Sequence, residues 1–148
     1  MTSRSDRSQL IGALLRVPYE VVWGRLLTGV HARGFTDITE PHLSVMRWPG
    51  PDGRRPSDVA ADLAMTKQAV NYLLGQLEER GYLTRDAHPD DPRGRLIGLT
   101  PRGEKLVAAM RATLTAIEAA LESELGATKF RRLRTSLVEL NATDFVVG

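Results

Sequence analysis

The chain has 148 residues, of which 42% are hydrophobic and 26% charged, with a net charge of +2, and these values suit one globular domain with a real core. It contains no cysteine, which excludes disulfides, thiolate zinc sites, a cysteine nucleophile and a cysteine-based redox switch. No apolar run approaches the roughly 18 residues that span a membrane, and the polar start lacks the apolar segment of a signal peptide, so we expect a cytoplasmic protein.

Apolar residues at helical spacings predict a long first helix over about residues 7–32. Pro18 lies inside this segment and has no backbone N–H to donate, so we expect a kink or a break near Val17. Gly34 follows at a position suited to end the helix.

A second, short helix is predicted to begin after Thr39, an N-cap residue followed by an acid and a proline, and to end before Pro49. Residues 49–53 read Pro-Gly-Pro-Asp-Gly, a composition that predicts a turn and excludes a helix.

The next segment predicts two helices joined by a tight turn. Ser57 is the expected N-cap of the first, Ala64 and Met65 form the turn, and Thr66 is the N-cap of the second. The second helix carries an apolar stripe at i, i+3, i+4 and i+7, made of Val70, Leu73, Leu74 and Leu77. Gly81 is expected to end it.

Two strands are expected next, over residues 82–85 and 95–99, around a turn that contains two prolines and Gly94. Thr100 and Pro101 then predict the start of a helix about 25 residues long, and a last helix is expected over about residues 128–141. The long helix has more apolar surface than one small lobe can cover, so we expect the ends of the chain to pack together and against a second copy, forming a homodimer.

Helix, turn, helix and then a β-hairpin is the layout of a winged helix-turn-helix, which presents one helix to a DNA groove and the hairpin to the neighbouring backbone. The fold class we expect is therefore mainly α with a small β-hairpin wing, and a DNA-binding regulator is the function that it favours. Seventeen of the 20 basic residues are Arg, which suits bidentate contacts with phosphate and guanine, although genome composition explains such a bias equally well.

The chain resembles the MarR family of bacterial transcription regulators in four stretches. These are Met65-Thr66-Lys67-Gln68-Ala69-Val70, Leu77-Glu78-Glu79-Arg80-Gly81-Tyr82-Leu83, Asp91-Pro92-Arg93, and Leu99-Thr100-Pro101-Arg102-Gly103. The resemblance implies a single domain over residues 1–148, with a DNA-binding lobe at 38–100, a small strand before the helix-turn-helix, and dimerisation helices at 7–33 and 101–146. Two departures are Pro92, where the family often has a second basic wing residue, and Pro18, in the region where members often hold effectors.

The face of the second helix opposite its buried stripe is the expected recognition surface. Gln68 and Asn71 are candidates for base-edge contacts because their amides can match adenine, and Tyr72 shares that face. Thr66 and Lys67, at the start of the helix, are candidates for phosphate contacts. An ordinary solvated helix face is the alternative.

Basic residues outside that helix complete the predicted DNA-binding set. Arg93 and Arg95 flank Gly94 at the wing, and Arg93 is expected to reach the minor groove or its phosphates. Arg54 and Arg55, with Ser57, are candidates for backbone contacts before and at the start of the helix-turn-helix. A solvated, charged loop and hairpin turn are the alternatives.

A small aromatic or anionic effector is a candidate partner, since the family resemblance makes an aromatic-lined pocket plausible. The candidate lining residues are Tyr19, Trp23, His42, Met46, Arg47 and Trp48, with Arg47 or His42 pairing with an anionic ligand. Core and interface packing is the simplest explanation of the aromatic and Met residues, and the histidines have no metal-ligand spacing.

The function we expect is a dimeric repressor on a pseudo-palindromic operator, released by a small molecule if an effector exists. A winged-helix module that binds protein and not specific DNA is the alternative. An enzyme is disfavoured because no nucleophile triad, phosphate-binding Gly loop or metal motif is visible, and no cofactor is expected.

Overall fold

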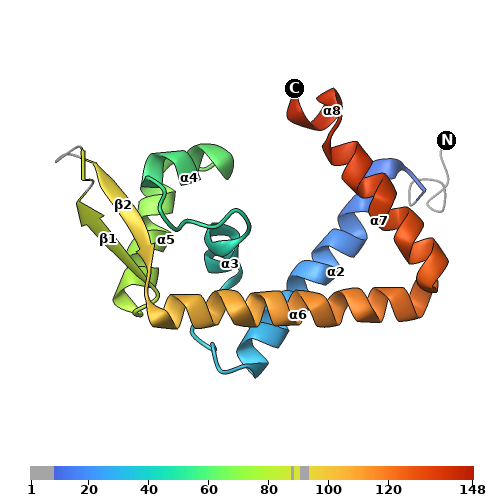
Figure 1. The fold of residues 1–148 in the computed structure, drawn as a ribbon, viewed down its shortest axis with the longest axis horizontal. Coiled ribbons are helices and arrows are strands. Elements are labelled where there is room, and N and C mark those ends of the chain that lie inside the picture. The colour runs from blue at the N-terminus through green and yellow to red at the C-terminus, as the bar shows by residue number, and fades with distance from the viewer. Residues whose placement is uncertain (1–8, 88, 91–93) are drawn as a thin grey trace, which may run out of the picture. The chain divides into compact units, whose positions relative to one another are not determined.

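A computed structural model describes residues 9–87, 89–90 and 94–148. It is mainly helical with one two-stranded sheet, as the sequence predicts (Figure 1). The elements in chain order are α2 (Ile11–Ala32), α3 (Glu40–Met46), α4 (Pro56–Asp62), α5 (Lys67–Glu79), β1 (Leu83–Ala87), β2 (Arg95–Leu99), α6 (Pro101–Leu125), α7 (Ala127–Asn141) and α8 (Asp144–Val147). The chain divides into two compact units, residues 1–111 and 112–148.

Helix α2 runs through Pro18 without the break that the sequence allowed near Val17. A proline in a helix interior removes one backbone hydrogen bond. The 22-residue helix nevertheless continues on both sides of Pro18. The helix ends as expected at Gly34, whose φ of +100° suits glycine. The N–H groups of Gly34 and Phe35 donate to the carbonyls of His31 and Val30, which satisfies two terminal acceptors.

Helix α3 begins after Thr39 as predicted, with a reciprocal cap that the sequence did not show. The backbone N–H of Thr39 donates to Nδ1 of His42 at 3.0 Å, so a histidine takes the place that Glu or Gln usually has in a capping box. Helix α4 begins at Pro56, so its N-cap is Arg55 and the prediction of Ser57 is wrong. Proline suits the first helical position because its φ is already helical and it lacks the N–H that would be unpaired there.

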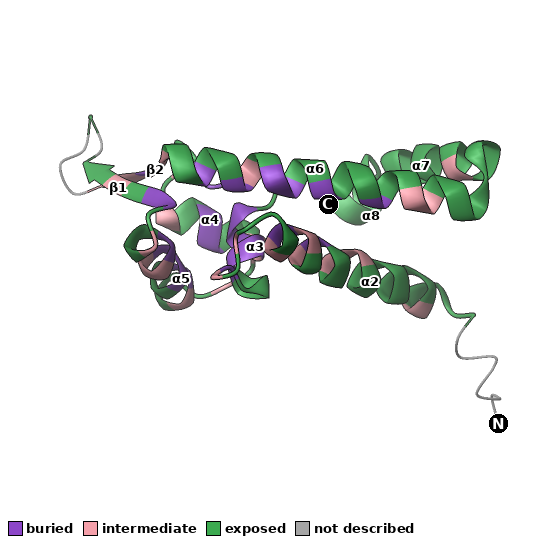
Figure 2. Cartoon of the chain, turned by 90° about the horizontal axis from the view of Figure 1, so that it is seen from below, coloured by how far each residue is buried: buried purple, intermediate pink, exposed green. Residues whose placement is uncertain are grey.

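The turn between α4 and α5 lies at Ala64, which adopts a φ of +51°, and Thr66 caps α5 by accepting a hydrogen bond from the N–H of Ala69 at 3.1 Å. The predicted stripe of α5 is buried in the lobe core. Apolar residues of α2, α3, α4 and β2 share this core, among them Leu26, Val30, Leu43, Val59 and Ile97 (Figure 2). Burial of this one face fixes which side of α5 is left for solvent.

The two strands form an antiparallel hairpin in which Leu83 pairs with Leu99 and Ala87 with Arg95. The prediction for β2 is confirmed, while β1 begins one residue later and ends two residues later than expected, because the N–H of Tyr82 still donates to Leu77 at the end of α5. In the described residues no strand precedes α4. Two backbone hydrogen bonds stand in its place, because Ile97 accepts from Gly53 and donates to Arg54 on the free edge of β2.

Helix α6 starts directly under the hairpin, where Gly103 packs on the backbone of Tyr82. A Cβ added at Gly103 would lie 2.1 Å from the carbonyl oxygen of Tyr82, so only glycine permits this approach. Thr100 caps the helix as predicted by accepting from the N–H of Gly103 at 3.0 Å. Its hydroxyl in turn donates to the carbonyl of Gly81.

Residues 112–148 comprise the second half of α6, helix α7 and the short helix α8. Of these three elements, only α8 was not predicted from the sequence. Neither α7 nor α8 has a buried residue, although both carry large apolar side chains. Phe145 is 90% exposed, and Leu133, Leu137 and Leu140 also face solvent.

Candidate nucleic-acid interface

A groove of about 430 Å³ lies on the lobe formed by the helix-turn-helix and the hairpin. It combines the start of α4, the first turns of α5 and both strands of the wing. Its lining residues are Arg55, Pro56, Ser57, Lys67, Asn71, Arg85, Gly94 and Arg95. Five of the ten predicted DNA-binding residues therefore meet at one place, although they are up to 40 residues apart in the sequence.

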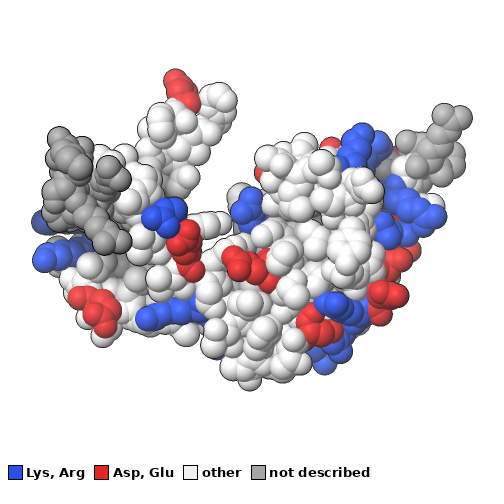
Figure 3. Space-filling model, turned by 180° about the vertical axis from the view of Figure 1, so that it is seen from behind, with Lys and Arg blue, Asp and Glu red and all other residues white. Residues whose placement is uncertain are grey.

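The groove is lined by four basic side chains and no acidic one. Arg55, Lys67 and Arg95 are exposed, and within the described part of the chain none of the three forms an ion pair. Figure 3 shows Lys and Arg side chains beside the wing, interspersed with Asp and Glu side chains that lie outside the groove lining. Such a concentration of unpaired positive charge attracts an anionic partner, although the chain as a whole carries a net charge of only +2.

Arg85 of β1 is the groove residue that sequence reasoning missed. Its Nε donates to Glu78 at 3.0 Å, its Nη1 donates to the Oδ1 of Asn71 at 3.3 Å, and its side chain passes 3.8 Å from where a Cβ of Gly75 would be. Because side chains alternate along a strand, Arg85 lies on the face of β1 that packs against α5. The sequence alone does not show which element covers that face. At that distance of 3.8 Å a Cβ on Gly75 would be in ordinary van der Waals contact with Arg85 and would not displace it.

The hydrogen bond from Arg85 changes what Asn71 can recognise. Because the Oδ1 of Asn71 accepts from Arg85, one of its two lone pairs is used, whereas both N–H bonds of Nδ2 remain for a partner. The bidentate adenine contact predicted for Asn71 would need the remaining lone pair of Oδ1 as well, so this geometry favours a base-edge acceptor such as guanine N7 or thymine O4.

The other predicted residues of α5 lie outside the groove lining but on the same helix. Gln68 and Tyr72 are exposed, as the position of the buried stripe predicts. Thr66 is exposed too, and its hydroxyl oxygen caps the helix by accepting from the N–H of Ala69, which leaves its O–H free to donate to a phosphate oxygen.

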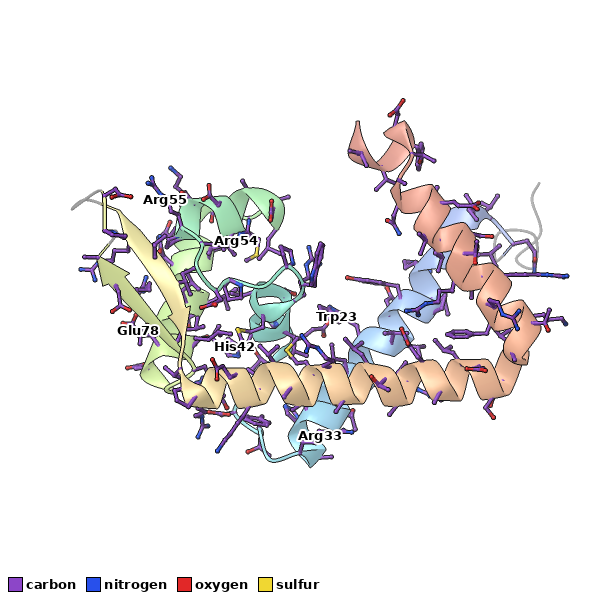
Figure 4. The ribbon with its side chains drawn as sticks, viewed as in Figure 1. Trp23, Arg33, His42, Arg54, Arg55 and Glu78 are labelled. Atoms are coloured by element: carbon purple, nitrogen blue, oxygen red, sulfur yellow. The ribbon has the colours of Figure 1, made fainter. Side chains whose placement is uncertain are left out.

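One predicted arginine, Arg54, has a different position from that expected. Arg54 turns away from the groove, since its Nη2 donates to Asp62 and to the carbonyl of Asp58, both on α4 (Figure 4). Arg93 lies outside the described residues. Arg95 donates from Nη1 to the carbonyl of Arg85 at 3.0 Å, which ties its side chain across the hairpin.

The six candidate effector residues do not form one pocket. Arg47 and Trp48 are exposed and border a cavity of about 160 Å³ beside α4, together with Arg54 and Asp62. Tyr19 and Trp23 form a tilted aromatic pair on α2 with ring centroids 6.1 Å apart, and Met46 is in the core. His42 is 1% exposed and both of its ring nitrogens have protein partners, so of the two residues predicted to pair with an anionic ligand Arg47 is the accessible one.

A polar brace joins the loop after α2 to the end of α5 and the start of α6. The hydroxyl of Tyr82 donates to Asp37, the guanidinium of Arg102 donates to both and lies 4.5 Å above the ring of Tyr82, and Arg80 donates to the carbonyl of Asp37. Burial alone would raise the pKa of Asp37. The hydrogen bond from Tyr82 and the charges of Arg102 and Arg80 outweigh it and lower that pKa. Burial and the same hydrogen bond raise the pKa of Tyr82.

Other kinds of site find no support among residues 9–87, 89–90 and 94–148. No group of three or more His, Asp or Glu in these residues could hold a metal ion. None of the helices in this part of the chain has the length and apolar character needed to cross a membrane.

Comparison with known proteins agrees with this geometry. Residues 37–94 match the model of the MarR family. The Transcriptional regulator HosA of Escherichia coli O111:H- is 35% identical over 77 residues, which make up 49% of this chain, and the chain spans about half (55%) of the length of that relative.

Solved structures match over almost the whole chain. CouR bound to a 23-mer DNA duplex has a TM-score of 0.72 at 23% identity and covers 95% of this chain and 98% of its own, which establishes the fold. CouR of Rhodococcus jostii RHA1 bound to p-coumaroyl-CoA has a TM-score of 0.69 at 26% identity, with 94% and 96% covered. The lobe at residues 37–94 therefore resembles the MarR family in sequence, and almost the whole chain shares the fold of these solved structures.

Proposed function

We propose that the protein is a sequence-specific, DNA-binding transcriptional regulator that acts as a homodimer. The observation that carries the proposal is the groove in which Arg55, Lys67 and Arg95 meet the recognition helix without an acidic residue. The basic side chains contact phosphates and set the position of the lobe, while Asn71 and Gln68 reach base edges in the major groove. Two copies of α5 on one face of the duplex require half-sites about 10 base pairs apart.

The relatives support this proposal. One solved relative was crystallised on a DNA duplex, and the curated relative is a transcriptional regulator. We further propose Arg93 and Ser57 as backbone contacts, on the grounds of the family's Asp-x-Arg wing spacing and the place of Ser57 in the groove lining.

We also propose that a small molecule releases the protein from DNA, because CouR of Rhodococcus jostii RHA1 was crystallised with p-coumaroyl-CoA. In this chain the pair of exposed Tyr19 and half-buried Trp23 on α2 is the aromatic surface that suits a phenolic ligand. A ligand acts only to the extent that it binds the DNA-free arrangement better than the DNA-bound one.

The test is a fluorescence-anisotropy titration of the protein with DNA from upstream of its own gene, repeated at several salt concentrations. The expected result is tight binding to one short palindrome, with log affinity falling against log salt by about 0.9 per neutralised phosphate. Weak binding that does not depend on sequence, or no binding at low salt, would contradict the proposal.

Variants divide the roles of the groove residues. Arg55→Ala, Lys67→Ala and Arg95→Ala should each weaken binding to all sequences and reduce the salt slope by about 1. Arg33→Gln is the matched control, since Arg33 carries the same charge at the end of α2, and its slope should stay unchanged (Figure 4).

A further inference from the structure

The hydroxyl of Tyr72 has a partner that leaves its proton free. Tyr72 is 66% exposed on the recognition face of α5, and its oxygen accepts a hydrogen bond from Nε2 of Gln76 at 3.0 Å. A phenolic hydroxyl has one proton to donate and accepts through its oxygen. Because the contact with Gln76 uses the oxygen as an acceptor, the O–H bond is left to point away from the helix.

The direction of that hydrogen bond follows from a histidine in the core. Nε2 of His42 lies 2.8 Å from Oε1 of Gln76, and Nδ1 lies 3.0 Å from the backbone nitrogen of Thr39. A backbone N–H can only donate, so Nδ1 accepts, and the neutral ring therefore carries its proton on Nε2. Nε2–H then donates to Oε1, which fixes the Gln76 amide with its NH₂ group toward Tyr72.

The surroundings make this arrangement hard to reverse. His42 lies between α3 and α5 (Figure 4), is 1% exposed, and also has the hydroxyl of Thr39 2.8 Å from Nδ1. Turning the amide of Gln76 over would place its NH₂ group against Nε2–H and leave two buried donors without an acceptor. Burial also lowers the pKa of His42, although the Gln76 bond and the Asp37 carboxylate act the other way and the Arg80 charge acts with burial, so the ring stays neutral at physiological pH.

We propose that this buried relay from Thr39 through His42 and Gln76 sets the hydroxyl of Tyr72 as a hydrogen-bond donor to a phosphate oxygen of bound DNA. The proposal rests on the DNA-binding function proposed above and assigns Gln76 and His42 as positioning residues. Phosphate oxygens only accept, so a hydroxyl set as a donor is attracted to them, whereas one that presents its lone pairs is repelled.

A reversal of the relay tests the direction of the hydroxyl. In Gln76→Glu the carboxylate still accepts from His42, but it must also accept from Tyr72, which turns the O–H inward. Gln76→Glu also adds a negative charge near DNA, so the matched background is Tyr72→Phe, which has no hydroxyl to turn. We expect Tyr72→Phe to lose about tenfold in affinity, and Gln76→Glu to cost about tenfold more in the wild-type background than in the Tyr72→Phe background.

Equal cost of Gln76→Glu in both backgrounds would overturn the proposal. Gln76→Leu neither orients the hydroxyl of Tyr72 nor adds a charge, so it should lose less affinity for DNA than Gln76→Glu does. Thermal unfolding of each variant checks that the lobe remains folded at the temperature of the titration.

The phosphate is identified with DNA that carries one neutral methylphosphonate at a time. At one backbone position the substitution should weaken the wild-type protein about tenfold and leave Tyr72→Phe unaffected. If no position behaves in this way, the hydroxyl does not contact a phosphate and the proposal fails.

A readout without DNA separates this proposal from the function on which it rests. Long-range proton–nitrogen NMR spectra of the free protein distinguish the two tautomers of His42, and a proton on Nε2 with a bare Nδ1 is expected near neutral pH. A proton on Nδ1 would overturn the relay even in a protein that binds DNA well. If the protein with the expected tautomer binds no DNA, the proposed function fails and the phosphate contact fails with it.

Discussion

At the scale of single residues, the contact between Arg85 and Asn71 determines which part of an amide is offered to a base. Arg85→Ala frees the Oδ1 of Asn71, so the amide can turn and accept as well as donate. We expect affinity for the preferred operator to fall about tenfold and discrimination at one base position to weaken by about 1–3 kcal/mol.

Binding to a set of operators with single base changes measures this effect. Arg85→Lys is the matched variant, since it keeps the charge but not the planar guanidinium that holds both Glu78 and Asn71. If Arg85→Ala lowers affinity equally for every base at every position, Arg85 is only a phosphate contact and Asn71 is not oriented by it.

The brace around Asp37 makes a second prediction at this scale. The pKa of Asp37 in the folded chain is below its ordinary value of 3.8, so its charge stabilises the fold above that pH. That stabilisation is lost as the pH falls through the lower, folded-state pKa. The free energy of unfolding, measured with urea across the acid range, should therefore decrease as the pH decreases. It should decrease less in Asp37→Asn.

The exposed carboxylate Glu124 on α6 is the control, and Glu124→Gln should leave the pH dependence almost as it is in the wild type. Asp37→Asn should also be less stable near neutral pH, because Arg102 and Arg80 lose a charged partner. An Asp37→Asn protein with the wild-type acid profile would show that the brace adds nothing to stability.

At the scale of elements, the junction between the hairpin and α6 depends on Gly103. Gly103→Ala places a methyl group 2.1 Å from the carbonyl oxygen of Tyr82, so the start of α6 must move. We expect a loss of about 1–3 kcal/mol in the free energy of unfolding, measured with urea. Gly24→Ala in α2 is the control, since no atom lies within 4 Å of its added Cβ, and it should stabilise the chain by up to about 1 kcal/mol.

The comparison of elements with their sequence patterns shows where prediction succeeds. The caps Thr39, Thr66 and Thr100 and the stripe of α5 were predicted because each depends on residues within a few positions of one another. The strand β2 was predicted for the same reason.

Contacts between elements account for what the sequence did not show. Arg85 lines the groove because β1 packs beside α5, where Arg85 contacts Asn71. Arg54 lies outside the groove because it binds Asp62 at the far end of α4. The burial of His42 depends on Gln76, which is 34 residues further along the chain. The start of α4 was misplaced because Ser57 and Pro56 are both good signals for a helix start, and the proline took the first helical position.

At the scale of the whole molecule, the exposed apolar side chains of α2 and of α7 and α8 support the proposed homodimer. Ile11 of α2 is 72% exposed, and residues of α7 and α8 that include Leu133, Val138 and Phe145 also face solvent. A soluble chain seldom leaves this much apolar surface in contact with water, so a second copy is the simplest cover. Sedimentation equilibrium should therefore give twice the mass of 16.3 kDa.

Ile11→Glu and Val138→Glu should each shift the protein toward the monomer and weaken its binding to a palindrome more than its binding to a half-site. Trp48→Glu is the control because Trp48 is 91% exposed but lies on a loop outside these helices, and it should leave the mass unchanged. A wild-type monomer at micromolar concentration would contradict the homodimer.

The buried imidazole between α3 and α5 also acts as a packing register. If α5 moved by one turn along α3, Gln76 would leave His42 and buried polar groups would lose their partners, at about 1–3 kcal/mol for each group. Together with the buried apolar stripe of α5, this pair therefore helps to fix the height at which Lys67, Gln68 and Asn71 stand above the core, so the reach of the protein into a DNA groove is determined from inside the fold.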